Sequence, residues 1–364
     1  MAALAGAALL AGIGALPAQQ QPWKFILFGD SNSFEPGADV NTNVLGELAR
    51  VVAAENPSFL LFLGDFSMSG MPASLALWTN AMTPVFRASV PVYPTVGNHD
   101  QFNTAALTNV FAAVVPDNGP VGEEQTTYAL AYNDALVLVL NEFSSSNNCR
   151  VNQPWVDAVL ATNTRPHVFA GGHLPAFKLL HGDCLGSYPT NRDIFWRSLS
   201  NANGRLYFSG HDHFYDHTRL DDGDGNPDND LHHITTGTGG GFLYPDGFYD
   251  GNNGLWKPAR IWHEPQYGYV SVEVCADRVT TVWHRRTETN SYALADVFSY
   301  SVLPRPVLRH SLSGGRLILS WSAAATLQAA PDPSGPFTNI QAAVPPFVVT
   351  DLSGPPLFYR LRLP

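Results

Sequence analysis

The chain has 364 residues, of which 45% are hydrophobic, so it can form two or three domains with a sizeable core and is not a wholly disordered protein. Its 31 acidic residues outnumber its 20 basic ones, giving a formal net charge of −11. This balance excludes a general nucleic-acid binder, which needs basic residues to neutralise phosphates. A phosphate ligand would need a local site, most simply one built around metal ions.

Residues 1–21 begin the chain with an uncharged apolar segment, which runs to about Ala18 and is rich in leucine, alanine and glycine. Such a segment is typical of a secretory signal and is too short to span a bilayer comfortably. We therefore expect a leader over residues 1–21 and a secreted or periplasmic protein of the bacterial export type, without a transmembrane segment in the mature chain. The alternative is an apolar N-terminal tail with no role in export.

Short apolar strands alternate with helical segments over the next 260 or so residues. Strands are expected at 24–29, 58–64, 92–96, 127–132, 135–141, 167–171, 205–209, 232–236, 267–274 and 279–284, and helices at 44–54 and 75–86. Near-continuous apolar strands separated by helices indicate sheets covered on both faces. The closely spaced pair 127–132 and 135–141 predicts a hairpin, so the sheets are mixed.

The composition changes near Pro304–Pro306, and the rest of the chain contains strand patterns at 316–321, 347–350 and 357–363 without a helical pattern. This predicts a small all-β domain of the sandwich type over 301–364, after a main domain over 22–300. Such domains resemble the appendages of exported bacterial enzymes, so we expect this one to contact a glycan or the cell surface.

Possible metal ligands follow five of the predicted strands. They occur in the sequences Gly29-Asp30-Ser31-Asn32, Gly64-Asp65, Gly97-Asn98-His99-Asp100, Gly172-His173 and Gly210-His211-Asp212-His213. Side chains just past the carboxyl ends of neighbouring strands converge on one crevice, and the glycines permit tight turns there. Carboxylates, imidazoles and an amide together suit Mn, Fe or Zn.

The order of these motifs resembles that of the calcineurin-like metallophosphoesterase superfamily, and in particular its purple acid phosphatase-like branch. The resemblance extends over about 24–284 and implies an α/β fold, a four-layer α/β/β/α sandwich of two mixed sheets. It implies a hydrolase with two divalent or trivalent transition-metal ions, in which a metal-bound hydroxide attacks phosphorus.

The resemblance also implies a role for each matching residue. Asp65 would bridge both metals, Asp30 and His213 would bind the first, and Asn98, His173 and His211 would bind the second. His99 would be the catalytic residue that assists the leaving oxygen, with Asp100 orienting it.

The chain departs from the family pattern at the first metal. Asn32 stands where many members have a histidine, and Met68 stands where purple acid phosphatases have a tyrosine. Asn32 can supply a neutral carbonyl oxygen as a metal ligand, or water can take its place.

An acidic segment provides a second possible metal site. Asp222, Asp224, Asn226, Asp228 and Asp230 alternate as in the start of a calcium loop, although Pro227 and His233 occupy positions where such a loop has glycine and glutamate. The alternatives are a structural calcium site and a solvated acidic turn.

The three cysteines, Cys149, Cys184 and Cys275, lack zinc-site spacing. In an exported protein we expect a Cys149–Cys184 disulfide that holds the segment presenting His173, with Cys275 buried as a small hydrophobic residue.

These observations favour an exported phosphatase that acts on a small phosphorylated substrate as a phosphomonoesterase. The alternatives are a phosphodiesterase or nucleotide hydrolase with the same site, and a non-catalytic surface-binding protein with a degenerate metal site. The aromatic residues Phe242, Tyr244, Phe248, Tyr249, Trp256 and Trp262 either line a substrate cleft or pack under long loops.

Overall fold

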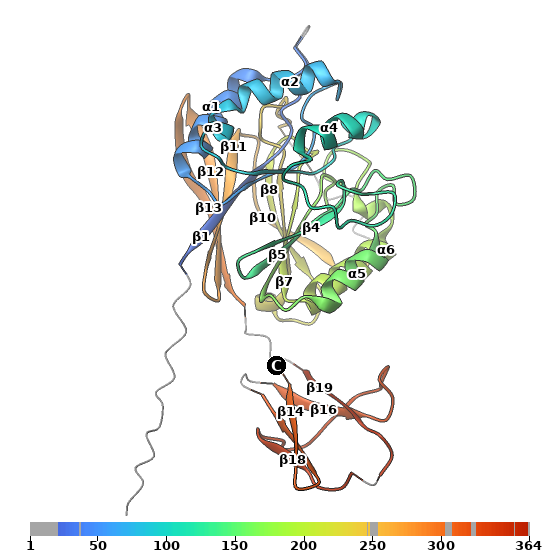
Figure 1. The fold of residues 1–364 in the computed structure, drawn as a ribbon. Coiled ribbons are helices and arrows are strands. Elements are labelled where there is room, and N and C mark those ends of the chain that lie inside the picture. Colours follow the sequence, from blue (N-terminus) through green and yellow to red (C-terminus); the bar gives the residue numbers. More distant parts are fainter. Residues whose placement is uncertain are drawn as a thin grey trace, which may run out of the picture.

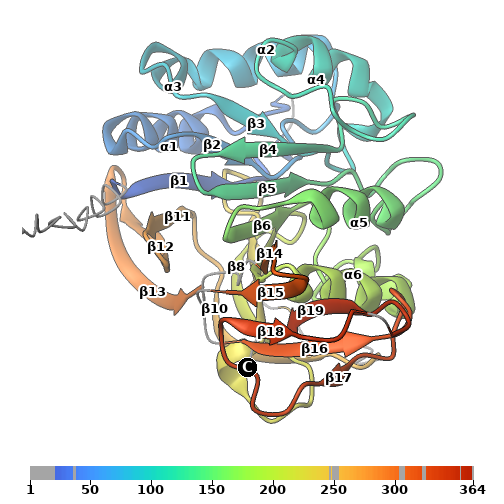
Figure 2. The same ribbon diagram turned by 60° about the horizontal axis from the view of Figure 1, so that its bottom comes forward.

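The computed structural model describes residues 21–362, except 36–37, 246, 248–253, 303–307, 322–324 and 353. The main part of the chain is a four-layer α/β/β/α sandwich, followed by a region that contains only strands among its described elements (Figures 1 and 2). This confirms the predicted fold class. The expected leader lies outside the described residues, apart from Gln21.

The first sheet has six strands in the order β13-β12-β11-β1-β2-β3. Strands β1, β2 and β3 are parallel, whereas β11, β12 and β13 add to β1 in antiparallel fashion, so the sheet is mixed. The bounds are β1 Trp23–Phe28, β2 Leu60–Phe62, β3 Val92–Pro94, β11 Gly268–Cys275, β12 Arg278–Glu288 and β13 Ser291–Ser301.

The second sheet has seven strands in the order β10-β8-β9-β7-β6-β5-β4, with β5, β6, β7 and β9 parallel and the others antiparallel. The predicted hairpin is β4 with β5. The bounds are β4 Tyr128–Tyr132, β5 Ala135–Val139, β6 His167–Gly171, β7 Gly204–Ser209, β8 Tyr215–Asp221, β9 Leu231–Thr236 and β10 Lys257–Glu264.

Helices cover the outer face of each sheet (Figure 2). They are α1 Thr42–Glu55, α2 Pro72–Ala81, α3 Thr83–Arg87 and α4 Thr104–Phe111 on the first sheet, and α5 Gln153–Thr162 and α6 Pro189–Asn201 on the second. The single helix expected over 75–86 is wrong, because the chain forms α2 and α3 there. Pro84 lies in the first turn of α3, a position where proline's missing N–H costs no helical hydrogen bond.

The alternation of side chains along β5 shows how the layers pack. Val137 and Val139 join the core between the two sheets, which includes Phe25, whereas Leu136 and Leu138 pack with Trp196 and the other buried side chains of α5 and α6. Each fully buried side chain of this size contributes about 1.5–3 kcal/mol through the hydrophobic effect. The two cores hold both sheets rigidly under the loops that follow their strands.

The C-terminal strands form two three-stranded sheets, β14-β15-β18 and β17-β16-β19. They enclose a small core around Leu319, Trp321 and Leu327. The bounds are β14 Arg309–Ser313, β15 Arg316–Ser320, β16 Thr326–Ala330, β17 Thr338–Asn339, β18 Phe347–Val349 and β19 Phe358–Arg362.

Candidate metal centre

The loops after β1, β2, β3, β6 and β7 meet at one edge of the two sheets. Backbone hydrogen bonds join them directly: the N–H of Asp30 donates to the carbonyl of Gly64, and the N–H of Gly210 donates to the carbonyl of His173. The structure therefore brings the five predicted motifs into one place.

Glycines make this close approach of the loops possible. A Cβ atom on Gly97 would lie 2.2 Å from Oδ1 of Asp65, and one on Gly210 would lie 2.3 Å from Oδ2 of Asp30. A Cβ on Gly64 would lie 2.6 Å from Nδ1 of His173. Side chains other than hydrogen at these positions would push the candidate ligands apart.

Three of the candidate ligands have left-handed backbone conformations. The φ angles are 63° at Asp30, 53° at Asp65 and 71° at His211. Residues other than glycine rarely adopt this region, and such strain often occurs at functional sites, where the surrounding structure enforces it.

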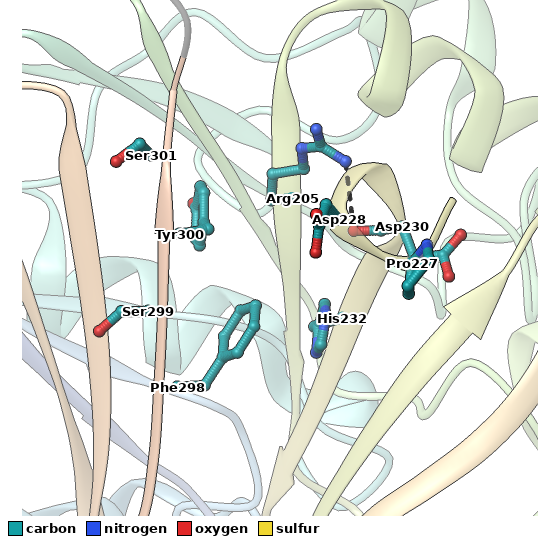
Figure 3. A pocket seen from close by; sticks show the side chains of 9 residues that line it. All are labelled: Arg205, Pro227, Asp228, Asp230, His232, Phe298, Ser299, Tyr300 and Ser301. Carbon is teal, nitrogen blue, oxygen red and sulfur yellow. Dashed lines mark hydrogen bonds between the residues drawn. The ribbon is translucent and has the colours of Figure 1, made fainter. Parts of the chain in front are cut away.

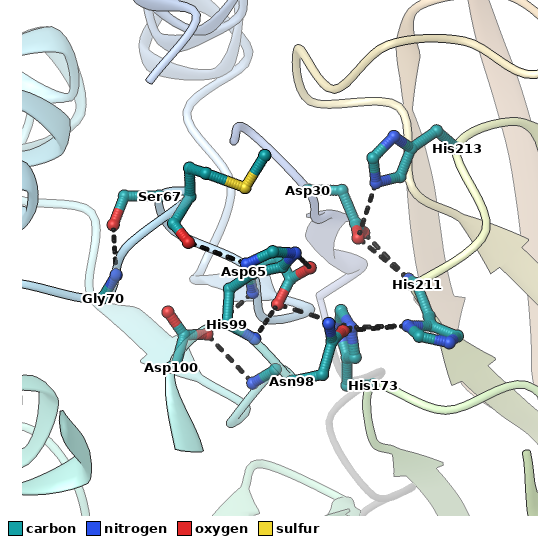
Figure 4. A network of polar contacts seen from close by, with 12 residues as sticks. Asp30, Asp65, Ser67, Gly70, Asn98, His99, Asp100, His173, His211 and His213 are labelled. Carbon is teal, nitrogen blue, oxygen red and sulfur yellow. Dashed lines mark hydrogen bonds and ion pairs between the residues drawn. The ribbon is translucent and has the colours of Figure 1, made fainter. Parts of the chain in front are cut away.

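The three residues expected to bind the second metal present their donor atoms to one another (Figure 4). Oδ1 of Asn98 lies 3.0 Å from both Nε2 of His173 and Nδ1 of His211, and these two nitrogens are 3.2 Å apart. Ligands at ~2.1 Å from one ion are separated by about this distance. Oδ1 of Asp65 is 3.6 Å from Nε2 of His173, on the same side.

The residues expected to bind the first metal form a second group beside Asp65. Nε2 of His213 lies 3.5 Å from Oδ1 of Asp30. Asp30, Asp65 and His173 each offer one ligand atom within 4.8 Å of the others, so Asp65 lies between the two groups. Burial alone would lower the pKa of His213, but the Asp30 carboxylate raises it above its ordinary value.

Asn32 is buried two residues past Asp30 with an exposed fraction of 1%. Neither its Oδ1 nor its Nδ2 has a hydrogen-bond partner among the described residues. A buried polar group of this kind is rare in folded proteins and is often explained by an ion or water. The Asn32 amide therefore fits a position beside the first metal.

Each of the three histidines presents one ring nitrogen to the centre and donates the other to an acceptor. Nδ1 of His173 contacts the carbonyl of Leu63 at 2.6 Å, Nδ1 of His213 contacts the carbonyl of Phe242 at 2.9 Å, and Nε2 of His211 contacts Oδ1 of Asp183 at 3.0 Å. Because a carbonyl oxygen can only accept, the outer nitrogens of His173 and His213 carry a proton, and the inner nitrogen of each of these rings is the one that can bind a metal. Metal-binding histidines are oriented in this way.

Asp183 was not predicted from the sequence. Its carboxylate raises the pKa of His211 to about 9, although burial acts in the opposite direction, and the hydrogen bond from His211 lowers the pKa of Asp183. A cation bound at Nδ1 would release the proton from that nitrogen. Asp183 would then hold the neutral imidazole in place.

His99 lies at the edge of the centre, where its Nε2 is 3.9 Å from Oδ2 of Asp65. Its Nδ1 donates to the carbonyl of Met68 at 2.7 Å, so Nε2 is the nitrogen that can exchange a proton with a bound group. The expectation that Asp100 orients His99 is wrong. The Asp100 carboxylate instead accepts from the backbone N–H groups of Asp65, Phe66 and Gly97.

A second histidine at the edge of the centre was missed. Nδ1 of His181 lies 2.6 Å from Oδ1 of the buried Asp212, and its ring centroid is 4.7 Å from that of His211. The sequence signal for it was Asp212, which lies between the candidate ligands His211 and His213. An acidic residue buried at that position needs a hydrogen-bond donor, and His181 provides one.

Glu142 supports the loop that carries His173. Its carboxylate accepts from the backbone N–H groups of His173 and Leu174 and from the hydroxyl of Tyr207. Burial raises the pKa of Glu142 to about 7.

The acidic segment does not bring its five predicted ligands together. The side chains of Asp222, Asp224 and Asn226 each accept from the backbone N–H two residues ahead, and Asp230 pairs with Arg219 at 2.6 Å. Asp222 and Asp230 instead form an acidic group with Asp221. Asp228 lies exposed at the edge of this segment.

The Cys149–Cys184 disulfide is not present in the structure, where both residues are free and buried. The two thiols are close enough for Cys184 to contribute to the raised pKa of Cys149, but they are not bonded. Burial raises the pKa of the Cys149 thiol to about 11.

A cavity of about 260 Å³ lies away from this centre (Figure 3). It is lined by Arg205 and His232, at the starts of β7 and β9, and by Phe298 and Tyr300 of β13. Because His211 follows the other end of β7, the cavity and the candidate metal centre occupy opposite ends of the strands.

Three solved structures with a similar fold are a plant phosphatase, a fish phosphatase and a Plasmodium anchor protein. The chain is similar to the purple acid phosphatase PPD1 from yellow lupin (15% identity, 79% of this chain, 55% of that one, TM-score 0.59). It is also similar to a dimetal phosphatase from Danio rerio (16%, 77% and 99%, TM-score 0.51) and to GAP50, the anchor in the inner membrane complex of Plasmodium (15%, 78% and 90%, TM-score 0.53). The match thus covers only about half of the lupin protein. No curated protein matches the sequence.

The family model of the calcineurin-like phosphoesterases matches residues 24–215, which contain His99 and every candidate ligand of the metal centre described above. The chain therefore belongs to the calcineurin-like phosphoesterase family and is a hydrolase of the metallophosphoesterase class.

Proposed function

We propose that this protein is a dinuclear metal-dependent phosphatase that hydrolyses small phosphomonoesters. The observation that carries the proposal is the orientation of His173, His211 and His213. Each turns one ring nitrogen toward Asp65 or its neighbours and fixes the other nitrogen through an acceptor. A binding or structural role for the fold does not require this orientation.

Asn98, His173 and His211 would hold one ion, and Asp30, Asn32 and His213 the other, with Asp65 between them. Mn, Fe or Zn suits this mixture of nitrogen and oxygen donors. When bound, two such ions polarise a phosphoryl group and make a water molecule acidic.

The chain's own residues would then position the ester and move the proton. His99 is about one-quarter exposed, and its Nε2 faces the centre while Met68 fixes the ring. Protonated at Nε2, it can donate to the leaving oxygen. His181, held by Asp212, can hydrogen-bond the phosphoryl group from the other side of the centre.

Two alternatives use the same structure. A phosphodiesterase or nucleotide hydrolase would need the same ligands and the same proton donor. A non-catalytic surface-binding protein is favoured by one comparison alone, the structure described as an anchor in Plasmodium. His99 argues against this alternative, since a binding site has no need for an oriented proton donor.

We also propose that the protein is exported, that residues 1–21 are its leader and that the C-terminal strands contact a glycan or the cell surface. Support for export comes from the uncharged apolar sequence of residues 1–21. No helix among the described residues is long and apolar enough to cross a membrane. N-terminal sequencing of the protein recovered outside the cytoplasm would test the leader, and an unprocessed N-terminus would contradict it.

The test of the main proposal is metal analysis together with an ester panel. We expect two metal ions per chain and faster hydrolysis of monoesters than of diesters. Preferential hydrolysis of diesters would select the first alternative. Two bound metals without hydrolysis of any ester would contradict catalysis.

A further inference from the structure

Two phenylalanine side chains beside the candidate metal centre are exposed to solvent. Phe34 has an exposed fraction of 55% and Phe242 one of 63%. Placing a phenylalanine ring in water forfeits the stabilisation that burial would give. Neither ring belongs to the buried cores of the two sheets.

Both residues are fixed next to the candidate ligand His213. The ring of Phe34 lies 6.4 Å from that of His213, between centroids. The carbonyl of Phe242 accepts the hydrogen bond from Nδ1 of His213. Phe34 and the backbone of Phe242 therefore both contact the side chain of His213, which faces Asp30 (Figure 4 shows His213 and Asp30).

Tyr244 joins Phe242 to the opposite edge of the centre. Its ring stacks on His213 with centroids 5.2 Å apart, meets the edge of Phe242 at 5.8 Å and lies 5.5 Å from His181. The aromatic rim, defined as Phe34, Phe242 and Tyr244, thus borders the centre on the side of His213. Of the other aromatic residues considered in this region, Trp256 is buried in the core of the second sheet, and Phe248 and Tyr249 lie outside the described residues.

We infer that the site takes phosphate esters whose alcohol part carries an aromatic ring, with the aromatic rim contacting that ring. This inference rests on the proposed phosphatase function. The phosphoryl group would occupy the polar centre formed by Asp30, Asp65 and the histidines. The alcohol part then extends outward, where the exposed faces of Phe34 and Phe242 supply apolar contact.

The aromatic rim can supply this preference because ring stacking is selective for shape and tolerant of chemical detail. Stacking of a base on an aromatic side chain changes affinity by roughly 5- to 150-fold. The same rim offers nothing comparable to a short alkyl group. An arylalkyl phosphate or a nucleoside monophosphate should therefore be a better substrate than an alkyl phosphate of equal leaving-group chemistry.

The experiment compares 2-phenylethyl phosphate with ethyl phosphate, because both release a primary alcohol and differ mainly in the ring. In the metal-loaded full chain we expect kcat/KM to be about tenfold or more higher for the phenylethyl ester. Phe34→Ala and Phe242→Ala should each remove most of that preference, because kcat/KM should fall much further for the phenylethyl ester than for ethyl phosphate. Phe358→Ala, which truncates an exposed phenylalanine of the C-terminal strands, is the matched control.

The outcomes separate this inference from the proposed function. Equal kcat/KM values for both esters, or parallel losses on both esters in the two variants, would overturn the aromatic preference while the phosphatase function stands. Failure to hydrolyse either ester with two metals bound would overturn the phosphatase function and the inference with it. Binding of phenylphosphonate over ethylphosphonate, measured by calorimetry, gives a second readout that needs no turnover.

Discussion

Substitution of Gly97 by alanine should separate Asp65 from the other candidate ligands without unfolding the protein. The added Cβ would lie 2.2 Å from Oδ1 and 2.3 Å from the backbone nitrogen of Asp65, and real Cβ contacts essentially never fall below 3.0 Å. The two loops must therefore move apart by roughly 1 Å. A displacement of that size at a reacting centre costs ~10²-fold in rate. We expect Gly97→Ala to lower kcat about 100-fold and to reduce the bound metal.

Gly182→Ala is the control, because a Cβ on Gly182 meets nothing within 4 Å although this residue precedes Asp183. Metal content by mass spectrometry, monoester hydrolysis and far-UV circular dichroism would be measured for both variants. Gly182→Ala should behave as the wild type. The reasoning is refuted if Gly97→Ala retains its full metal content and rate.

The remaining predictions concern single side chains. Asp65→Asn should lower bound metal and activity together, whereas His99→Ala should keep both metals and lose ~10²–10⁴ in rate, which metal analysis and kinetics can distinguish. Asp183→Asn should weaken metal binding by ~10–100-fold, because His211 loses its carboxylate partner, and unchanged affinity in a competitive chelator titration would contradict this. Burial lowers the pKa of His233 to about 4 from an ordinary value near 6.5. The folded protein therefore holds this ring neutral, whereas the unfolded chain binds a proton there below about pH 6.5. The free energy of unfolding should thus be ~3 kcal/mol lower at pH 4 than above pH 6.5 as a result of this one group. Urea unfolding of chelator-treated protein should show this loss, and His233→Gln should reduce it; an equal loss in the variant would rule out His233 as the source.

The positions of the candidate ligands could be predicted because they depend on strand ends. Apolar runs mark the buried strands, and the parallel order of β1, β2 and β3 places their carboxyl ends at one edge. Asp30, Asp65 and Asn98 follow those ends within a few residues. The predicted hairpin and the mixed sheets are also confirmed. The connection between β4 and β5 is so short that the two strands can only pair in antiparallel fashion.

Strands β8, β10 and β13 were not predicted. β13 mixes half-buried and exposed residues without strict alternation, and β8 carries charged residues whose burial is compensated by partners from elsewhere. Asp216 of β8, for example, is buried against Arg260 and His263 of β10. The local hydrophobicity of a sequence does not reveal a strand whose charged side chains are paired with charges on a neighbouring strand.

The role of Asp100 shows a similar limit. Its place beside His99 in the sequence suggested that it orients that ring, but adjacent residues of a tight turn direct their side chains differently. Three backbone N–H groups of two loops converge on its carboxylate instead. The ring of His99 is held by the carbonyl of Met68, a backbone atom whose position depends on the fold and on no particular side chain.

Asn32 stands where many family members have a histidine, and its surroundings bear on whether the centre can still bind a metal. A buried amide such as that of Asn32, which has no hydrogen-bond partner within the described part of the chain, costs about 1–3 kcal/mol. A well-packed apolar side chain at this position would avoid this cost. Asp30, with its left-handed backbone, and Gly97, with no space for a side chain, are further local costs at the same edge of the sheets. Costs of this kind concentrated around one set of donors are expected where function, and not stability, determines the residues. We infer that Asn32 replaces one ligand by another and does not mark a degenerate site.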